Sequence, residues 1–309
     1  MVETEILPLA PLWVRAGAKL VKRLPAGRYR VMNALPRPAE SFLARLPAAS
    51  GGYVFACDLR DTIAREACFT GQYEPQETAI LTALLRPGQC FVDVGANWGY
   101  HTLLAAHLVG KQGRVVSFEP DPRLFPILQN NLQLNDLTQV TALQIAAADA
   151  AGELPMAGFA LGDGNFGLSR LVVNGDAAGV FPVATERLDD ALARLGVATI
   201  DLLKMDIEGA EGLALQGLAE NLQAGRVHRL LLELHPAQLA ERGAQAADII
   251  KQLQHYGYRG WKIAHSLAAY RRAAYAQTVN VKEFISPLRP DEPLDDWPHL
   301  LWRAPGVEE

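Results

Sequence analysis

The sequence predicts an α/β fold with a mostly parallel sheet and helices on both faces. Short apolar runs of strand length alternate with stretches of helical spacing along most of the chain. The runs at 91–94 and 115–118 are apolar almost throughout, as in parallel strands that are covered on both faces. Half of the 309 residues are hydrophobic, which is enough for one large domain with extensions. Seven strands are expected, at 91–94, 115–121, 140–145, 200–206, 230–236, 260–265 and 300–303.

The stretch 91–102 predicts a buried strand, a glycine turn and the first turn of a helix. Gly95 and Gly99 let the backbone turn sharply and approach a ligand without a Cβ in the way. Such a turn offers backbone N–H groups and the positive end of a helix dipole, and Asp93 adds a carboxylate. Together they suit the zwitterionic end of an amino acid. The ligand-binding residues expected here are Asp93, Val94, Gly95, Ala96, Asn97, Gly99 and Tyr100.

This turn differs from the fingerprint of a nicotinamide dinucleotide site. That fingerprint is G-x-G-x-x-G, with glycines where the pyrophosphate approaches the backbone. Counted from Gly95, the second and third glycine positions hold Asn97 and Tyr100. A pyrophosphate would meet side chains there, so the pattern disfavours such a site.

The next two strands suggest how a nucleoside would be held. Glu119, followed by Pro120, ends the strand after the glycine turn, where a carboxylate accepts hydrogen bonds from both ribose hydroxyls. A solvent-facing acid at a strand end is the alternative. After the third strand, the small residues Ala146, Ala147 and Ala148 leave room for a flat ring, and Asp149 offers an acceptor to an exocyclic amine, which fits adenine. Asp149 could equally cap a turn.

A helix is expected to start near Pro75, because proline suits the first helical turn. Tyr73 and Glu74 precede it. They either cap this helix or lie over the ligand, since the helix would pack beside the central strand.

Lys204, Asp206, Glu208 and His235 follow or end the fourth and fifth strands, whose carboxyl ends point toward the same crevice as Asp93. Asp206, Glu208 or His235 could accept a proton, and Lys204 could orient Asp206. An Asp/Glu pair could also hold a divalent cation. The ligand set is incomplete on the sequence, so we predict no metal.

Residues 1–52 are expected to form a helical extension and residues 53–309 the main domain. The extension is basic, which suits a solvated helix face or a peripheral contact with a membrane, whereas the whole chain carries a net charge of −5 and is not expected to bind nucleic acid. The three cysteines form no C-x-x-C pair and predict reduced thiols. Without an apolar span or a signal-peptide pattern, we expect a cytoplasmic protein.

Taken together, five motifs resemble those of the FkbM family of S-adenosylmethionine (SAM) dependent methyltransferases. They are G-Q-Y-E-P-Q-E (71–77), F-V-D-V-G-A-N-W-G-Y-H-T (91–102), S-F-E-P-D (117–121), K-M-D-I-E-G-A-E (204–211) and L-L-E-L-H (231–235). The resemblance implies a Rossmann-like class I methyltransferase fold, with a seven-stranded sheet whose last strand is antiparallel. It also implies SAM as methyl donor and a hydroxyl oxygen as acceptor, on a small molecule or a carbohydrate.

Two other functions fit part of the pattern: a dinucleotide-dependent oxidoreductase, and a SAM-binding module without turnover. A nucleic-acid methyltransferase is disfavoured, because there is no N-P-P-Y type motif for a flipped base. The segment 152–180, rich in Gly, Asn and Asp, is expected to be a loop or hairpin. It would serve as a lid over the site or form a plain surface excursion. The acceptor and the oligomeric state do not follow from the sequence.

Overall fold

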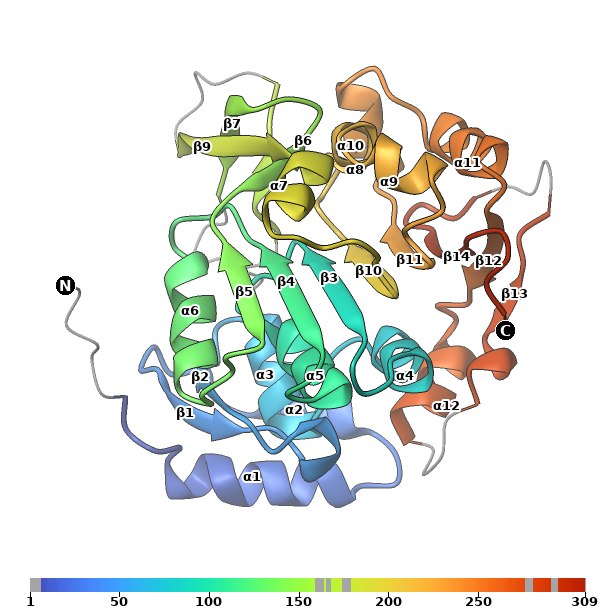
Figure 1. Cartoon of the computed structure of the whole chain (residues 1–309). Helices are drawn as coiled ribbons and strands as arrows, with labels where there is room; N and C mark the ends of the chain where they lie inside the picture. The colour runs from blue at the N-terminus through green and yellow to red at the C-terminus, as the bar shows by residue number, and fades with distance from the viewer. Residues whose placement is uncertain are drawn as a thin grey trace.

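The computed structural model describes residues 7–158, 164, 168–173, 179–275, 280–289 and 294–308. Within these residues there are three β-sheets, of eight, four and two strands. The eight-stranded main sheet runs through the middle of the molecule, as Figure 1 shows.

The main sheet contains all seven strands that the sequence predicts. From one edge to the other its order is β13 (Ile285–Pro287), β12 (Arg259–Ile263), β14 (His299–Arg303), β11 (Arg229–Glu233), β10 (Leu202–Met205), β3 (Cys90–Val94), β4 (Arg114–Phe118) and β5 (Val140–Leu143). The strands from β11 to β5 are parallel, and β14 lies antiparallel between β11 and β12. This is the expected class I methyltransferase arrangement. The predicted count was one strand short, because β13 adds an antiparallel edge strand beside β12.

Helices cover both faces of the main sheet, which explains the continuous apolar character of its strands. Phe91 points into the core on one face, while Val92 and Val94 point into the core on the other. The first face carries α4 (Pro75–Leu84), α5 (Tyr100–Val109), α6 (Phe125–Gln133) and α12 (Leu267–Tyr275). The second carries α7 (Leu188–Arg194), α8 (Glu211–Gln216), α9 (Ala219–Gln223), α10 (Pro236–Glu241) and α11 (Ala246–His255).

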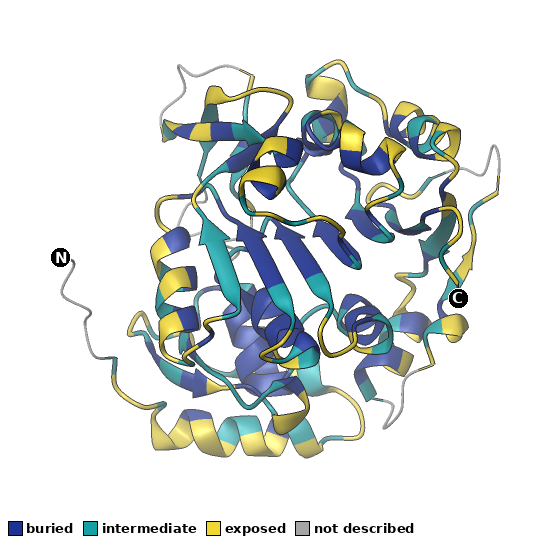
Figure 2. Cartoon of the chain, viewed as in Figure 1, coloured by how far each residue is buried: buried dark blue, intermediate teal, exposed yellow. Residues whose placement is uncertain are grey.

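The N-terminal part packs against the first face and belongs to the same core. It consists of α1 (Leu12–Arg23), α2 (Arg28–Ala34), β1 (Phe42–Arg45), a 3-10 turn at Ala48–Ser50, β2 (Val54–Cys57) and α3 (Thr62–Thr70). Strands β1 and β2 pair as a hairpin, so the predicted boundary between residues 52 and 53 falls inside a hairpin. Figure 2 shows α1 as the largely exposed outer layer of this part.

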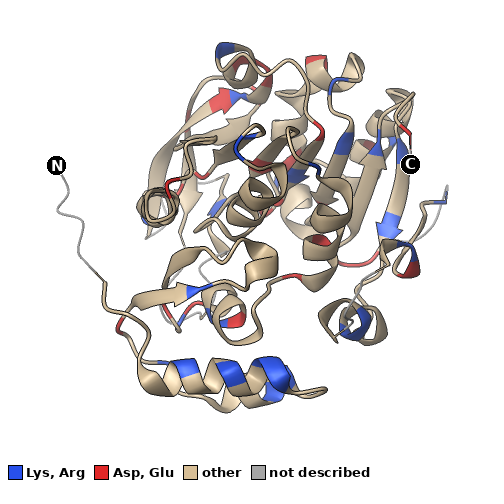
Figure 3. Ribbon diagram, turned by 60° about the horizontal axis from the view of Figure 1, so that its bottom comes forward, with Lys and Arg blue, Asp and Glu red and all other residues tan. Residues whose placement is uncertain are grey.

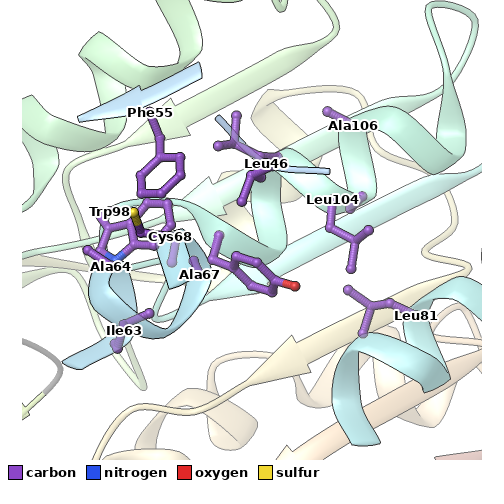
Figure 4. Packing of buried hydrophobic residues seen from close by; sticks show 14 of the residues in the cluster. Leu46, Phe55, Ile63, Ala64, Ala67, Cys68, Leu81, Trp98, Leu104 and Ala106 are labelled. Carbon is purple, nitrogen blue, oxygen red and sulfur yellow. The ribbon is translucent and has the colours of Figure 1, made fainter. Parts of the chain in front are cut away.

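One aromatic contact joins the N-terminal part to the glycine turn. The ring of Phe55 on β2 stacks on Trp98, with ring centroids 4.8 Å apart (Figure 4). Asn131 on α6 reinforces this contact, because its side chain donates to the Trp98 carbonyl and accepts from the Ala56 N–H, both at 2.8 Å. The turn is therefore held from outside by β2 and α6.

A four-stranded second sheet forms where the sequence suggested a loop or hairpin. Its order is β6 (Ala146–Ala148), β9 (Val180–Arg187), β7 (Gly152–Ala157) and β8 (Arg170–Leu171). The hairpin part of the prediction is confirmed, because β7 pairs antiparallel with both β8 and β9. The stretches 159–163, 165–167 and 174–178 lie outside the described residues, so the segment 152–180, expected to be a lid or a surface excursion, is described only in part. No helix in the described parts of the chain is long and apolar enough to cross a bilayer.

Candidate active site

A cavity of about 220 Å³ opens at the carboxyl ends of β3, β4 and β10. In a parallel sheet this is the edge where ligands bind. Twelve predicted site residues line it: Tyr73, Glu74, Val94, Gly95, Ala96, Asn97, Tyr100, Glu119, Pro120, Lys204, Asp206 and Glu208. Its wall also includes residues that sequence reasoning had not assigned to the site: Trp98, His101, Phe118, Ile145, Met156 and Glu233.

The glycine turn shapes the wall of the cavity, but its backbone N–H groups already donate hydrogen bonds within the protein. Gly95 and Ala96 both donate to the Phe118 carbonyl at 3.0 Å, and the next three N–H groups also have protein acceptors. The sequence predicts that these N–H groups face a ligand, whereas in the structure they face protein acceptors. Gly95 has φ +88°, and a Cβ there would lie 2.0 Å from the Asp206 carbonyl oxygen. Only glycine lets the β3 turn pass this close to the end of β10.

Glu119 connects the second strand of the site to the turn. Its Oε2 accepts from the Asn97 N–H at 2.7 Å and its Oε1 from the Asp121 N–H at 2.9 Å. The side chain is only 4% exposed, and it reaches the cavity. Burial raises the pKa of Glu119 to about 7, against the two backbone N–H groups that lower it. Each oxygen keeps a lone pair for a ligand hydroxyl.

Asp93 lies behind the cavity wall. It is 1% exposed, and its Oδ2 accepts from the Thr102 hydroxyl at 2.6 Å. Its Oδ1 has no hydrogen-bond partner within the described residues. Burial raises the pKa of Asp93, and Lys204, its neighbour across β3 and β10, opposes this shift. Asp93 thus anchors α5 to β3, and its predicted contact with a ligand stays a prediction.

The entry to α4 lies over the cavity. Glu74 precedes this helix with φ +43° and makes no capping hydrogen bond with its side chain. Its Oε2 instead points toward His101 Nε2 at 3.7 Å and Lys204 Nζ at 4.0 Å. Burial raises the pKa of Glu74 to about 8 and lowers that of His101 to about 3. Of the two predicted roles of Tyr73 and Glu74, the geometry favours the one at the ligand.

Lys204 and Asp206 form the charged floor of the site. Lys204 Nζ lies 3.2 Å from Asp206 Oδ2, and both residues line the cavity. Burial alone would lower the pKa of Lys204, but Asp206 and Glu74 outweigh burial and hold that pKa above its ordinary value. Burial would likewise raise the pKa of Asp206, and Lys204 reverses this and lowers it. Both groups are therefore charged at neutral pH.

His235 lies beneath this floor, outside the cavity wall, and is 3% exposed. Its Nδ1 is 2.8 Å from Oε1 of the buried Glu211 on α8. Its Nε2 faces carboxylate oxygens of Glu208, Glu233 and Asp206 at 3.4, 3.6 and 3.9 Å. Glu233 could have been found from the sequence, because it alternates with His235 at the end of β11. Which carboxylates face each nitrogen of His235 could be known only from the fold.

The apolar end of the cavity contains part of the stretch predicted for adenine. Ala146 and Ala147 line it, whereas Ala148 and Asp149 do not, and Asp149 is exposed. The chain leaves the main sheet after β5, and β6 pairs with β9 instead, which carries Ala148 away from the cavity. The wall here is formed by Phe118, Leu124, Ile145, Ala146, Ala147 and Met156. Gly99 also lies outside the lining; a Cβ on it would meet Leu128 at 2.6 Å.

With this geometry in place, the chain was compared with known proteins. The family model of the methyltransferase FkbM domain matches residues 93–259, more than half of the chain. The chain belongs to the FkbM methyltransferase family. The matched range contains both acidic strand ends, the glycine turn, the charged floor of Lys204 and Asp206, and His235. Most of the cavity wall therefore lies in the family's domain, and Ile63, Tyr73 and Glu74 lie before it. SAM is the cofactor that goes with this family.

Curated relatives of this FkbM-family chain resemble it over part of its length. It is 34% identical to methyltransferase sdnD of Sordaria araneosa over 157 residues, which is 42% of this chain and 60% of sdnD. It is 27% identical to the 31-O-demethyl-FK506 methyltransferase FkbM of Streptomyces tacrolimicus over 203 residues, covering 56% and 74% of the two chains. The 2-O-methyltransferase NoeI of Sinorhizobium fredii is 29% identical over 162 residues, covering 48% and 64%. The chain thus spans less than two thirds of sdnD and of NoeI.

Solved structures with a similar chain path include an rRNA methylase from Streptococcus thermophilus. It has a TM-score of 0.40 and 11% identity, and the match covers 74% of this chain and 93% of that one. Aeropyrum pernix fibrillarin with bound SAM gives a TM-score of 0.38 and 14% identity, with coverage of 74% and 73%.

The residues of the cavity fit SAM. Glu119, with a lone pair left on each oxygen, suits the two ribose hydroxyls, and the apolar wall from Phe118 to Met156 suits an adenine ring. The opposite end carries Lys204 and Glu74, which suits a group that has both a carboxylate and an amine.

Proposed function

We propose that this chain transfers a methyl group from SAM to a hydroxyl oxygen of a small molecule or a carbohydrate. The observation that carries the proposal is one cavity with an acidic ribose-type contact at Glu119 and a charged floor at Lys204 and Asp206. Two relatives add support, since their names denote methylation at an oxygen: the 31-O-demethyl-FK506 methyltransferase and the 2-O-methyltransferase.

When bound, SAM supplies an electrophilic methyl group on a sulfonium, whose leaving thioether needs no acid. The protein then has two tasks, which are to align the acceptor and to take its proton. Asp206 lines the cavity and is kept ionised by Lys204, so it would accept a hydrogen bond from the attacking hydroxyl. Glu208 also lines the cavity and has its carboxylate toward His235, which places a second acceptor for the proton at the same edge.

The test is methyl transfer from ¹³C-methyl-labelled SAM to a panel of polyols, sugars and hydroxylated small molecules, followed by mass spectrometry and NMR. We expect a labelled methoxy group on one class of acceptor. Asp206→Asn should abolish transfer and keep affinity for S-adenosylhomocysteine (SAH). Asp190→Asn, an equal change at an exposed position on α7, is the matched control. Label on nitrogen or carbon, or stabilisation by NAD and not by SAM, would contradict the proposal.

A further inference from the structure

The cluster around His235 has the composition and spacing of a cation site. One ligand atom from each of Asp206, Glu233 and His235 lies within 4.8 Å of the other two. The His235 Nε2 separations of 3.4 to 3.9 Å from three carboxylate oxygens are longer than hydrogen bonds. Atoms that share one cation at bonds of about 2.1 Å are about 3.0 to 3.4 Å apart. Glu233 and Asp206, at 3.6 and 3.9 Å from His235 Nε2, lie slightly farther apart than that.

The orientation of His235 is a second and independent observation. The imidazole is 97% buried, and its Nδ1 is held by the buried Glu211 at 2.8 Å. With the proton on Nδ1, the lone pair of Nε2 points at three carboxylates and makes no hydrogen bond with any described residue. A carboxylate behind the far nitrogen of a histidine is the usual support of a metal ligand, since it fixes the tautomer and the ring orientation.

Asp206 divides its two oxygens between different partners. Oδ2 binds Lys204 Nζ at 3.2 Å, and Oδ1 faces His235. The positive charge of Lys204 is therefore paired with Oδ2 of Asp206, and Oδ1 is left to face the cluster around His235. The carboxylates of Glu208 and Glu233 face the same imidazole nitrogen as that oxygen. Besides Lys204 and His235, His299 on β14 is a basic side chain in contact with this group, at 3.4 Å from Glu233.

We propose that Asp206, Glu233 and His235 bind one divalent cation of the Mg²⁺ and Mn²⁺ class at the edge of the cavity. Carboxylate oxygens are the donors that these ions prefer, and a single imidazole is compatible with Mn²⁺. The sequence alone predicted no metal because Glu233 was not counted among the ligands. In the reaction, and here the inference rests on the proposed function, the cation would bind the acceptor hydroxyl and lower its pKa.

The test is a titration of EDTA-treated full-length protein with Mn²⁺, with free Mn²⁺ measured by electron paramagnetic resonance. We expect one Mn²⁺ per chain and an electron spin-echo modulation from an imidazole nitrogen. Glu233→Gln and His235→Gln should each weaken binding by at least about tenfold, and His235→Gln should remove the nitrogen signal. Glu241→Gln, at an exposed acid on α10, should change neither. Thermal unfolding checks that each variant is folded.

Three outcomes would overturn the cation site: no Mn²⁺ bound, binding that is indifferent to both variants, or loss of binding in His265→Gln in place of His235→Gln. The last would assign the ion to the neighbouring group Glu77, His265 and His299. SAH calorimetry on the same EDTA-treated protein separates this proposal from the proposed function. Absence of SAH binding would count against the methyltransferase reading, whereas absence of Mn²⁺ binding counts against the cation alone.

The outward face of α1 carries a second inference, independent of the site. Val14 and Val21 on the inner face are buried, whereas Leu12 is 79% and Leu20 is 59% exposed. Trp13, at 39%, and Leu9, just before the helix, at 75%, extend the apolar surface. Arg15, Lys19, Lys22 and Arg23 lie on the same helix, and the described α1 contains no acidic residue; Figure 3 shows this row of basic residues at the bottom.

We propose that this face of α1 docks on an anionic lipid surface. Exposed leucine and tryptophan beside a row of lysine and arginine is the pattern of helices that lie in the membrane interface. Each basic side chain near such a surface contributes about 1 kcal/mol. The net charge of the whole chain is −5, so the basic helix is a local feature that sets the orientation of docking.

The test is cosedimentation of the full chain with vesicles of phosphatidylcholine, with and without phosphatidylserine. We expect binding to the anionic vesicles alone, weakened by salt, and reduced by about tenfold or more in Arg15→Glu/Lys19→Glu. Leu12→Ala/Leu20→Ala should reduce it as well, and Lys251→Glu, on the exposed side of α11, should not. No vesicle binding, or a dimer in solution that the leucine variant dissociates, would overturn the lipid assignment.

Discussion

Replacing Glu119 with glutamine tests how the cavity holds a nucleoside. The carboxylate is 4% exposed and already accepts from two backbone N–H groups, at 2.7 and 2.9 Å. In Glu119→Gln one oxygen becomes an NH₂ group, which faces a backbone donor and no longer accepts from a ribose hydroxyl. The change keeps the size of the side chain, so the shape of the cavity is retained.

The expected loss follows from the bonds removed. A hydrogen bond to a charged acceptor is worth about 1.5 to 3 kcal/mol. Losing the charge and one or both hydroxyl contacts therefore costs about 3 to 4 kcal/mol, or a 100- to 1000-fold higher Kd for SAH. Because burial raises the pKa of Glu119 to about 7, the hydroxyls meet a carboxylate fully only above that pH. SAH binding by the unmodified protein should tighten from pH 6 to pH 8, and that of the variant should not.

Isothermal titration calorimetry with SAH at pH 6 and pH 8 measures both effects. Glu153→Gln is the matched control, since Glu153 is exposed on β7. Equal affinity in Glu119→Gln and in the unmodified protein at pH 8, or an equal loss in the control, would refute the ribose contact.

Three further predictions concern stability. Burial raises the pKa of Glu66 from 4.5 to about 7, so its contribution to the free energy of unfolding is fully present below pH 4.5 and is lost as pH rises through 7. In urea unfolding, Glu66→Gln should therefore be more stable than the unmodified protein by up to about 3 kcal/mol at pH 8, and by little at pH 5. Gly95→Ala should lose about 2 kcal/mol more than Gly88→Ala, because both have φ near +87° but only Gly95 places a Cβ against the Asp206 carbonyl; equal thermal shifts would contradict this. Asn131→Ala removes two hydrogen bonds of a buried side chain and should cost about 2 to 3 kcal/mol, and a loss under 0.5 kcal/mol would show that the glycine turn does not need α6.

The main sheet was predictable because its strands are short apolar runs separated by turn residues. Each of the seven expected strands is present, and the glycine turn lies at the end of β3 as expected. The edge strand β13 was missed, since Ile285 to Pro287 carries neither alternation nor an apolar run long enough to mark a strand.

The site residues at the ends of parallel strands could be predicted from the sequence, and those elsewhere less well. Acids that end parallel strands must meet at one edge, and Glu119 and Asp206 do so. Asp149 was placed by counting strands, which fails here because the chain leaves the main sheet after β5 to pair with β9. The contacts of His235 with Glu211 and of Glu77 with His299 join residues far apart in sequence, which no local pattern encodes.

The central claim is that one ligand, the nucleoside of SAM, occupies the cavity between β4 and β10. A crystal structure of the protein with SAH tests it most directly. We expect the ribose hydroxyls within hydrogen-bond distance of Glu119, the adenine beside Phe118, and the thioether sulfur turned toward Asp206. SAH bound outside this cavity, or with its ribose away from Glu119, would contradict it.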